Sequence, residues 1–138
     1  MPLIIDGWNL LRNKNSDIKV HRDSLMDSVG ALVSRLEVYQ MCHSDPITVV
    51  FDSRRRDSRI AFPRTSRLRI LTAEDADDHI KRSIESTPPE QRRNLRVVSS
   101  DNEICAYAKL HSATVLRSDE FWAKLKRDRA AHNPGRGR

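Results

Sequence analysis

Short apolar strands alternate with helical patterns along this chain, and that alternation restricts its fold more than any other feature. Ile47–Phe51 is an unbroken run of β-branched and aromatic residues, typical of a strand that is covered on both faces. Asp23–Met41 carries leucine and valine at spacings of three and four, which places them on one face of a helix. Such alternation favours a parallel sheet with helices on both sides. Further strands are predicted at Pro2–Ile5, Leu68–Leu71, Leu95–Val98 and Ala113–Leu116, and further helices from about Thr72, over Asn102–Leu110 and from Ser118 onward.

The length fits a single domain. A chain of 138 residues can bury about two-thirds of its unfolded surface, which is enough for a proper core. The last residues, Ala130–Arg138, contain two glycines, one proline and two arginines, a composition typical of a disordered end. We therefore expect one domain over residues 1–127 and a basic, flexible tail over residues 128–138.

Positive charge is concentrated in two segments. The chain has a formal net charge of +6 and a pI of about 9.8. Ser53–Arg69 carries seven arginines and one aspartate, and Lys124–Arg138 carries six basic residues and one aspartate. These segments contribute +6 and +5, so the other 106 residues sum to −5. A mildly acidic body with basic segments makes nucleic acid the first partner to consider.

The cysteines and the apolar runs bear on location. Cys42 and Cys105 form neither a disulfide framework nor a zinc-binding pattern, and are expected to be small buried side chains in a reducing compartment. No signal-peptide pattern is apparent, and no run of about 18 apolar residues would span a membrane. A cytoplasmic location without membrane contact is the resulting expectation.

Acidic residues stand at the ends of the predicted strands. Asp6, Asp52 and Asp101 each follow a strand, and Asp77 and Asp78 lie in an acidic segment, Glu74–Asp78, where a helix follows the third strand. In an open parallel sheet, the C-terminal ends of the strands and the N-termini of the helices meet at one edge. Clustered carboxylates repel each other, which raises their pKa values unless a cation neutralises them. The pattern favours a hard divalent ion, Mg²⁺ or Mn²⁺.

Each acid has a simpler explanation when it is taken alone. Asp6 could be a turn residue, Asp78 a helix-start charge and Asp101 an N-cap. Capping accounts well for Asp101 but poorly for Asp6 and Asp52, because each of these follows an apolar strand at the same edge. The joint pattern therefore favours a metal site.

The arginine-rich segment begins directly after Asp52, so it should lie beside the acidic edge. Arginines next to an acidic metal site are typical of enzymes that cleave phosphodiester bonds, and arginine also stacks on unpaired bases. The alternative is a solvated basic loop without a partner. The predicted RNA-binding residues are Arg54, Arg55, Arg56, Arg59, Arg64 and Arg67.

Four short motifs occur in order: DGWN at Asp6–Asn9, VVFDS at Val49–Ser53, ADDHI at Ala76–Ile80 and VVSSDNE at Val97–Glu103. They resemble the NYN/PIN-like nucleases, especially the YacP-like subgroup, over residues 3 to about 125. The resemblance implies an α/β, PIN-like (Rossmann-like) three-layer fold with a central, mostly parallel sheet in strand order 3-2-1-4-5. It also implies divalent-metal-dependent endoribonuclease activity.

The same resemblance implies roles for individual residues. Asp6, Asp77 and Asp101 would bind the metal, with Asp78 as the adjacent alternative. Asp52 would be a further acid at the rim, and Asn9 would orient Asp6 or touch a phosphate. Relatives act on RNA associated with translation, so mRNA and the ribosome are the partners it suggests.

The sequence departs from the subgroup pattern at two positions. Trp8 stands where tyrosine is usual, and Asn102 where arginine is common. Trp8 could stack on a base or pack in the core, and packing is the favoured interpretation.

These observations predict a metal-dependent endoribonuclease, with a catalytically silent PIN-like RNA-binding module as the alternative. A receiver domain is disfavoured, because it needs an acid pair after the first strand and this chain has Asp6 followed by Gly7. A phosphatase with a D-x-D motif is disfavoured because Trp8 occupies the third position. The RNA target, the number of metal ions, the oligomeric state and a role as a toxin remain open at this point.

Overall fold

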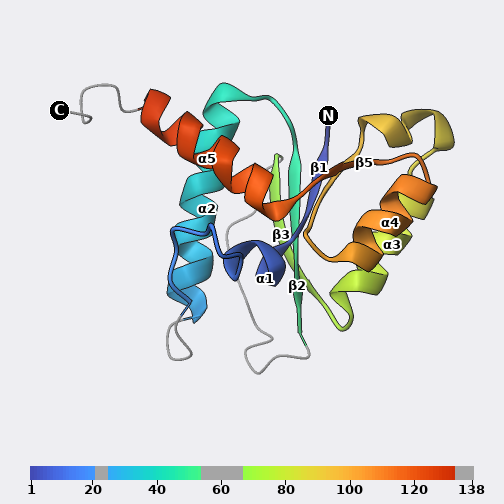
Figure 1. The fold of residues 1–138 in the computed structure, drawn as a ribbon, viewed down its shortest axis with the longest axis horizontal. Helices are drawn as coiled ribbons and strands as arrows, with labels where there is room; N and C mark the ends of the chain where they lie inside the picture. The colour runs from blue at the N-terminus through green and yellow to red at the C-terminus, as the bar shows by residue number, and fades with distance from the viewer. Residues whose placement is uncertain (21–24, 54–66, 133–138) are drawn as a thin grey trace.

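Five parallel strands form one sheet in the order β3-β2-β1-β4-β5 (Figure 1). A computed structural model describes residues 1–20, 25–53 and 67–132. All four strand pairs are parallel, which confirms the predicted fold class and strand order. The strands are β1 (Leu3–Asp6), β2 (Ile47–Asp52), β3 (Leu68–Ala73), β4 (Arg96–Val98) and β5 (Thr114–Leu116).

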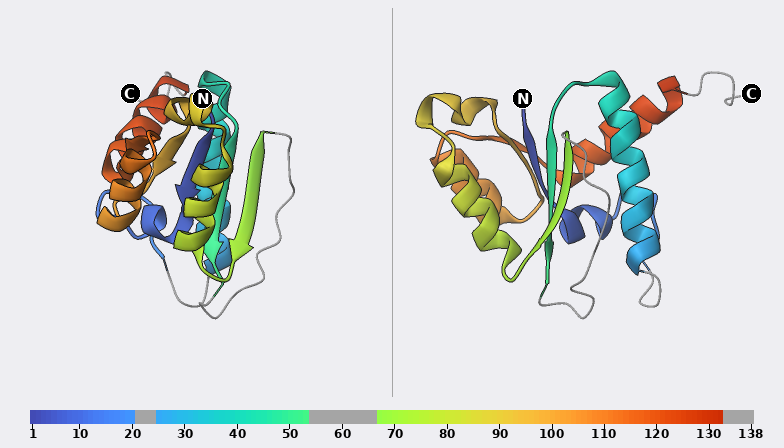
Figure 2. Two further views of the ribbon diagram at one scale, coloured as in Figure 1. Left: turned by 90° about the vertical axis from the view of Figure 1, so that its right-hand side faces the viewer. Right: turned by 180° about the vertical axis from the view of Figure 1, so that it is seen from behind.

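Helices cover both faces of the sheet and complete a three-layer arrangement (Figure 2). One face packs against α1, α2 and α5, and the other packs against α3 and α4. Within the described ranges, no helix combines the length and apolarity needed to cross a membrane. The bounds are α1 (Gly7–Leu11), α2 (Leu25–Cys42), α3 (Ala76–Ser86), the 3-10 helix η2 (Pro89–Asn94), α4 (Asn102–Leu110) and α5 (Ser118–His132).

Alternate residues of the central strands enter opposite cores. Leu3 and Ile5 belong to the core under α1, α2 and α5, whereas Ile4 between them belongs to the core under α3 and α4. Phe51 and Val50 divide in the same way on β2. Because side chains along a strand alternate between faces, a strand buried on both sides must be apolar throughout. This is why the runs at β1 and β2 predicted the sheet.

The structure corrects several local predictions. The helix after β3 begins at Ala76 rather than near Thr72, which lies in β3. Asp75 caps this helix by accepting a hydrogen bond from the Asp78 backbone N–H. Helix α5 continues to His132, so part of the expected flexible tail is helical, and residues 133–138 lie outside the described ranges. Cys105 is buried as expected, but Cys42 is exposed.

Helix α1 follows β1 directly and was not predicted. Its first residue, Gly7, lies against the ring of Phe51, where a Cβ atom would come within 2.5 Å of the ring carbon Cε1. A side chain larger than hydrogen therefore cannot fit without displacing the ring. The close approach brings α1 down onto the end of β2, next to Asp52.

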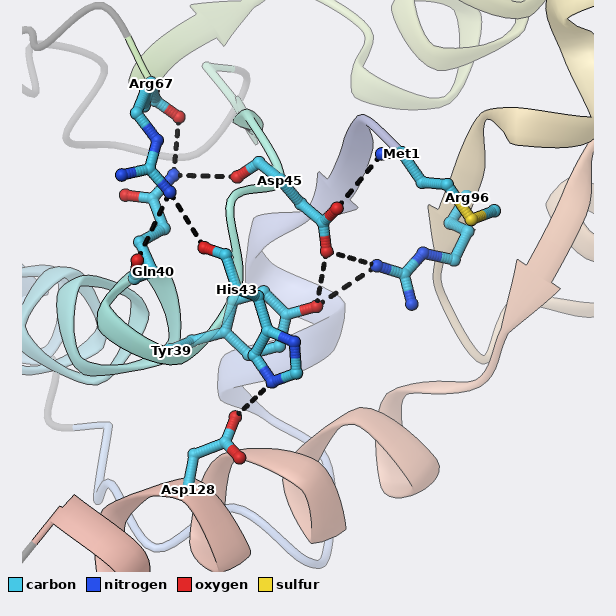
Figure 3. A network of polar contacts seen from close by, with 8 residues as sticks. All are labelled: Met1, Tyr39, Gln40, His43, Asp45, Arg67, Arg96 and Asp128. Carbon is cyan, nitrogen blue, oxygen red and sulfur yellow. Dashed lines mark hydrogen bonds and ion pairs between the residues drawn. The ribbon is translucent and has the colours of Figure 1, made fainter.

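A network of polar contacts ties the opposite, N-terminal edge of the sheet together (Figure 3). Asp45 accepts hydrogen bonds from the Met1 ammonium at 3.0 Å, the Tyr39 hydroxyl at 3.0 Å and the Arg96 guanidinium at 2.6 Å. His43 at the end of α2 contacts Asp128 of α5 at 3.0 Å. These contacts hold α2, α5 and the starts of β1 and β4 in place at the edge remote from the acids.

Candidate active site at the C-terminal edge of the sheet

A cleft of about 730 Å³ lies at the C-terminal edge of the sheet. It is formed by the ends of β1 and β2, by α1 and the loop after it, and by the starts of α3 and α5. Three of the predicted acids, Asp6, Asp52 and Asp77, line it together, although they are far apart in the sequence. The remaining lining residues are Trp8, Asn9, Arg12, Asn13, Lys14, Ala76, Ser100, Arg117 and Asp119.

Asp6 is the most deeply placed of these acids, with only 9% of the residue exposed. Burial, and then the charge of Asp77, raises its pKa to about 6, with a smaller contribution from Asp101. The Ser99 hydroxyl donates a hydrogen bond to Asp6 at 3.3 Å, which lowers the pKa of Asp6 and so opposes the effect of burial. The nearby backbone N–H of Asn9 acts in the same direction. Asp6 nevertheless makes no side-chain cap hydrogen bond to α1. The carboxylate therefore sits in an environment that resists its negative charge.

Asp77, in the first turn of α3, shows the same effect. Burial, followed by the charges of Asp101 and Asp75, raises the pKa of Asp77, while Lys81 opposes the rise. The acids of three separate chain segments thus influence one another electrostatically. This is the convergence that the strand-end pattern predicted.

Asp101 has a double position. Its Oδ1 accepts hydrogen bonds from the backbone N–H groups of Glu103 at 2.9 Å and Ile104 at 3.1 Å, so it caps α4. It does not line the cleft, yet its charge contributes to the raised pKa values of Asp6 and Asp77. Both of the roles considered for Asp101, helix cap and member of the acidic cluster, are therefore compatible with its place.

Asp78 lies outside the cleft lining. It is 51% exposed and forms an ion pair with Arg82 at 3.0 Å, one helical turn along α3. Adjacent helix residues face different directions, so only Asp77 of this pair reaches the cleft.

The donor set of the cleft suits a hard cation. Within residues 1–20, 25–53 and 67–132, no three acidic, histidine or cysteine side chains are close enough to hold a metal ion as they stand. Magnesium, however, keeps several of its waters and is usually bound by one or two carboxylates together with substrate phosphates. Asp6 and Asp77 supply two such carboxylates, whose raised pKa values a cation would lower.

Asn9 joins three elements of the site. Its Oδ1 accepts hydrogen bonds from the Ser100 backbone N–H at 2.9 Å and from the Ser118 hydroxyl at 2.7 Å. The carbonyl end of the amide is thus committed to the protein, which fixes α1 against the β4–α4 loop and the start of α5. The sequence motif identified Asn9 but not these two serine partners.

Trp8 is almost fully buried, although it contributes to the lining of the cleft. It is only 6% exposed, its ring meets Phe51 edge-on at 4.8 Å, and its Nε1 donates to the Asp52 carbonyl at 3.3 Å. The guanidinium of Arg12 lies 5.3 Å from the ring centre. The packing interpretation of Trp8 agrees with this placement.

Of the six predicted RNA-binding arginines, Arg67 falls within the described residues, and it lies away from the cleft. Arg67 lies at the start of β3, at the opposite edge of the sheet, and its guanidinium donates to the carbonyls of Gln40 at 3.2 Å and His43 at 2.8 Å. The other five, Arg54, Arg55, Arg56, Arg59 and Arg64, lie outside the described residues.

The cleft contains charged residues that sequence reasoning did not select. Arg12 and Lys14 were missed because α1, which delivers them, was not predicted. Arg117 and Asp119 lie at the start of α5, with Arg117 just before the helix and Asp119 in its first turn. Their position after the fifth strand, at the same edge as the other strand ends, was the available signal.

A family model described as the YacP-like NYN domain matches residues 3–135. The chain belongs to the YacP-like NYN domain family. NYN domains are nucleases, so membership indicates a nuclease-type function related to RNA. A direct search of the curated proteins gives no significant match.

Solved structures support the fold of this NYN domain. Two crystal structures of Rae1 (YacP) from Bacillus subtilis, the second of a mutant, match with TM-scores of 0.76 and 0.75. The matches cover 97% of this chain in both cases, and 78% and 80% of the other chains. The sequence identities are 15% and 18%, so these matches establish the fold alone.

Proposed function

We propose that this NYN domain is a metal-dependent endoribonuclease that hydrolyses RNA phosphodiester bonds with Mg²⁺ or Mn²⁺. The observation that carries the proposal is the convergence of Asp6, Asp52 and Asp77 on one cleft. A protein would gain nothing in stability by gathering carboxylates whose pKa values are raised by burial and mutual repulsion. A functional requirement for a cation explains the arrangement.

Each residue of the site has its own role in the proposed reaction. Asp6 and Asp77 would hold the cation, which would lower the pKa of a bound water molecule and stabilise negative charge on the phosphate. Asp101 adds negative potential from the start of α4, and Asp52 stands at the rim of the same cleft. Asn9 holds α1 against the β4–α4 loop through its hydrogen bond from the Ser100 backbone, which keeps the preceding Asp6 in position.

The proposed substrate is single-stranded RNA, including mRNA, in the cytoplasm. The arginines between positions 54 and 64 remain proposed RNA contacts. The ribosome stays a prediction that derives from the family resemblance alone.

Cleavage of a mixed RNA pool tests the proposal. Purified protein should cut RNA in the presence of Mn²⁺ or Mg²⁺ and stop when EDTA is added, and the mapped ends would reveal the cleavage preference. Asp6→Asn and Asp77→Asn should abolish cutting. Asp78→Asn is the matched control, because it removes the same charge one residue away at an exposed position outside the cleft lining. Equal cutting by Asp77→Asn and Asp78→Asn would refute the assignment.

The alternative is an RNA-binding module without catalysis. Two observations favour it: the described residues hold no ready three-ligand metal group, and the Asp101 carboxylate is engaged in capping α4. This alternative predicts that the protein binds RNA equally with Mn²⁺ or EDTA and leaves it intact in both.

A further inference from the structure

Three basic side chains line the same cleft as the carboxylates. Arg12 and Lys14 lie in the segment directly after α1, separated by one residue, and Arg117 immediately precedes α5. All three residues are exposed. An acidic cleft alone repels a polyanion, so cations placed in its lining are what allow RNA phosphates to approach the acids.

Arg12 is held in place by an aromatic support. Its guanidinium lies 5.3 Å from the centre of the Trp8 ring, within the range of a cation–π contact. Trp8 is itself fixed by Phe51 and by its hydrogen bond to the Asp52 carbonyl. The tryptophan that departs from the subgroup pattern thus positions a cation beside the acids.

Arg117 is anchored by contacts of its own. It directly precedes Ser118, the residue whose hydroxyl donates to Asn9. Its guanidinium donates to the Ser100 carbonyl at 3.1 Å and to the Cys105 sulfur at 3.9 Å. A guanidinium has five N–H donors, so in the described structure three stay available for a phosphate. Anchoring two donors on the protein orients the others, which reduces the entropy lost on binding.

We infer that this cleft contains two separate binding points for the RNA backbone, one at Arg12 and Lys14 and one at Arg117, each contacting a different phosphate. The inference rests on the proposed function for its substrate class. It assigns RNA contacts to residues that line the cleft, in addition to those proposed for the arginine-rich segment that follows β2.

Fluorescence anisotropy with a short single-stranded RNA, in EDTA and over a range of salt, tests the inference without requiring cleavage. Arg12→Gln, Lys14→Ala and Arg117→Ala should each raise Kd several-fold. Each lost phosphate contact should also reduce the slope of log K against log salt by about 0.7. Arg93→Ala is the matched control. Arg93 is an exposed residue of η2, ahead of β4 and remote from the cleft, so this substitution removes one positive charge without touching the cleft. Arg12→Gln keeps the side-chain stem against Trp8, and circular dichroism and thermal unfolding verify folding.

RNA carrying a single neutral methylphosphonate at successive positions separates the two points. Arg12→Gln should become insensitive to neutralisation at one phosphate and Arg117→Ala at another, and their effects on log Kd should add. Binding by all three variants equal to that of Arg93→Ala would overturn the inference, as would sensitivity of both arginines to one shared phosphate. If the variants bind RNA more weakly but the wild-type protein does not cut RNA with Mn²⁺ or Mg²⁺, the inference is supported and the proposed catalysis is refuted.

Discussion

Replacing Asp6 with asparagine should make the protein more stable and inactive at the same time. Asp6 is buried, and burial together with the charges of Asp77 and Asp101 raises its pKa from 3.8 to about 6. At about 1.4 kcal/mol per pKa unit, keeping this carboxylate ionised in the folded protein at pH 7 costs about 3 kcal/mol. Asparagine has nearly the same size and no charge. We therefore expect the free energy of unfolding at pH 7, in EDTA, to rise by up to about 3 kcal/mol.

The pH dependence gives the prediction its sign. Because the folded-state pKa of Asp6 lies above its unfolded value, the folded wild-type protein binds the additional proton between about pH 6 and pH 4. The contribution of Asp6 to wild-type stability therefore increases as pH falls through this range. The asparagine variant lacks this contribution, so the stability difference should be largest above pH 6 and nearly vanish close to pH 4.

Urea unfolding at several pH values, with EDTA present, measures the effect. Asp78→Asn serves as the control, because it removes an exposed acid from the same region. Adding Mn²⁺ should stabilise the wild-type protein by mass action and leave Asp6→Asn nearly unchanged. A variant that unfolds at the same or lower urea concentration at pH 7 would refute the reasoning, and so would a difference that is constant with pH.

Three further substitutions test the structure around the site. Gly7→Ala should destabilise the fold by about 1–3 kcal/mol in thermal or urea unfolding, because its Cβ would meet the ring of Phe51. Asp45→Asn should cost about 2 kcal/mol at pH 7. Burial opposes ionisation of Asp45, but the hydrogen bonds from the N-terminal ammonium and a tyrosine, together with an arginine charge, lower its pKa. The stability that the ionised Asp45 contributes is therefore present above about pH 4 and is lost below it. Trp122→Phe should cost about 1–3 kcal/mol, because the buried Nε1 donates to the Leu10 carbonyl at 2.7 Å; equal midpoints for variant and wild type would contradict this.

The fold was largely accessible from local patterns. Runs such as Ile47–Phe51 must be covered on both faces, and helical patterns between them supply the cover. Parallel strands place their C-terminal ends at one edge, so the meeting of Asp6, Asp52 and Asp77 followed from chain order alone. The structure and the family membership agree with that reasoning about architecture.

Side-chain direction and local backbone were not accessible in this way. Nothing local shows that Gly7 starts a helix, because α1 depends on the approach of Gly7 to Phe51 across two strands. Without α1, the arrival of Arg12 at the cleft could not be predicted. Arg67, although part of a basic segment, is used at the far edge to hold the end of α2.

The sequence by itself determined the alternation of strands and helices and the edge at which the acids gather, because periodicity and chain direction are local properties that a parallel sheet converts into position. The order of the strands was implied by the family resemblance and not by these local patterns. Only the tertiary structure decided which acids line the cleft, since Asp77 and Asp78 are neighbours that the rotation of α3 sends to different surroundings. It also decided which cations join them. These choices depend on distances between segments far apart in the chain, and no short stretch of sequence contains that information.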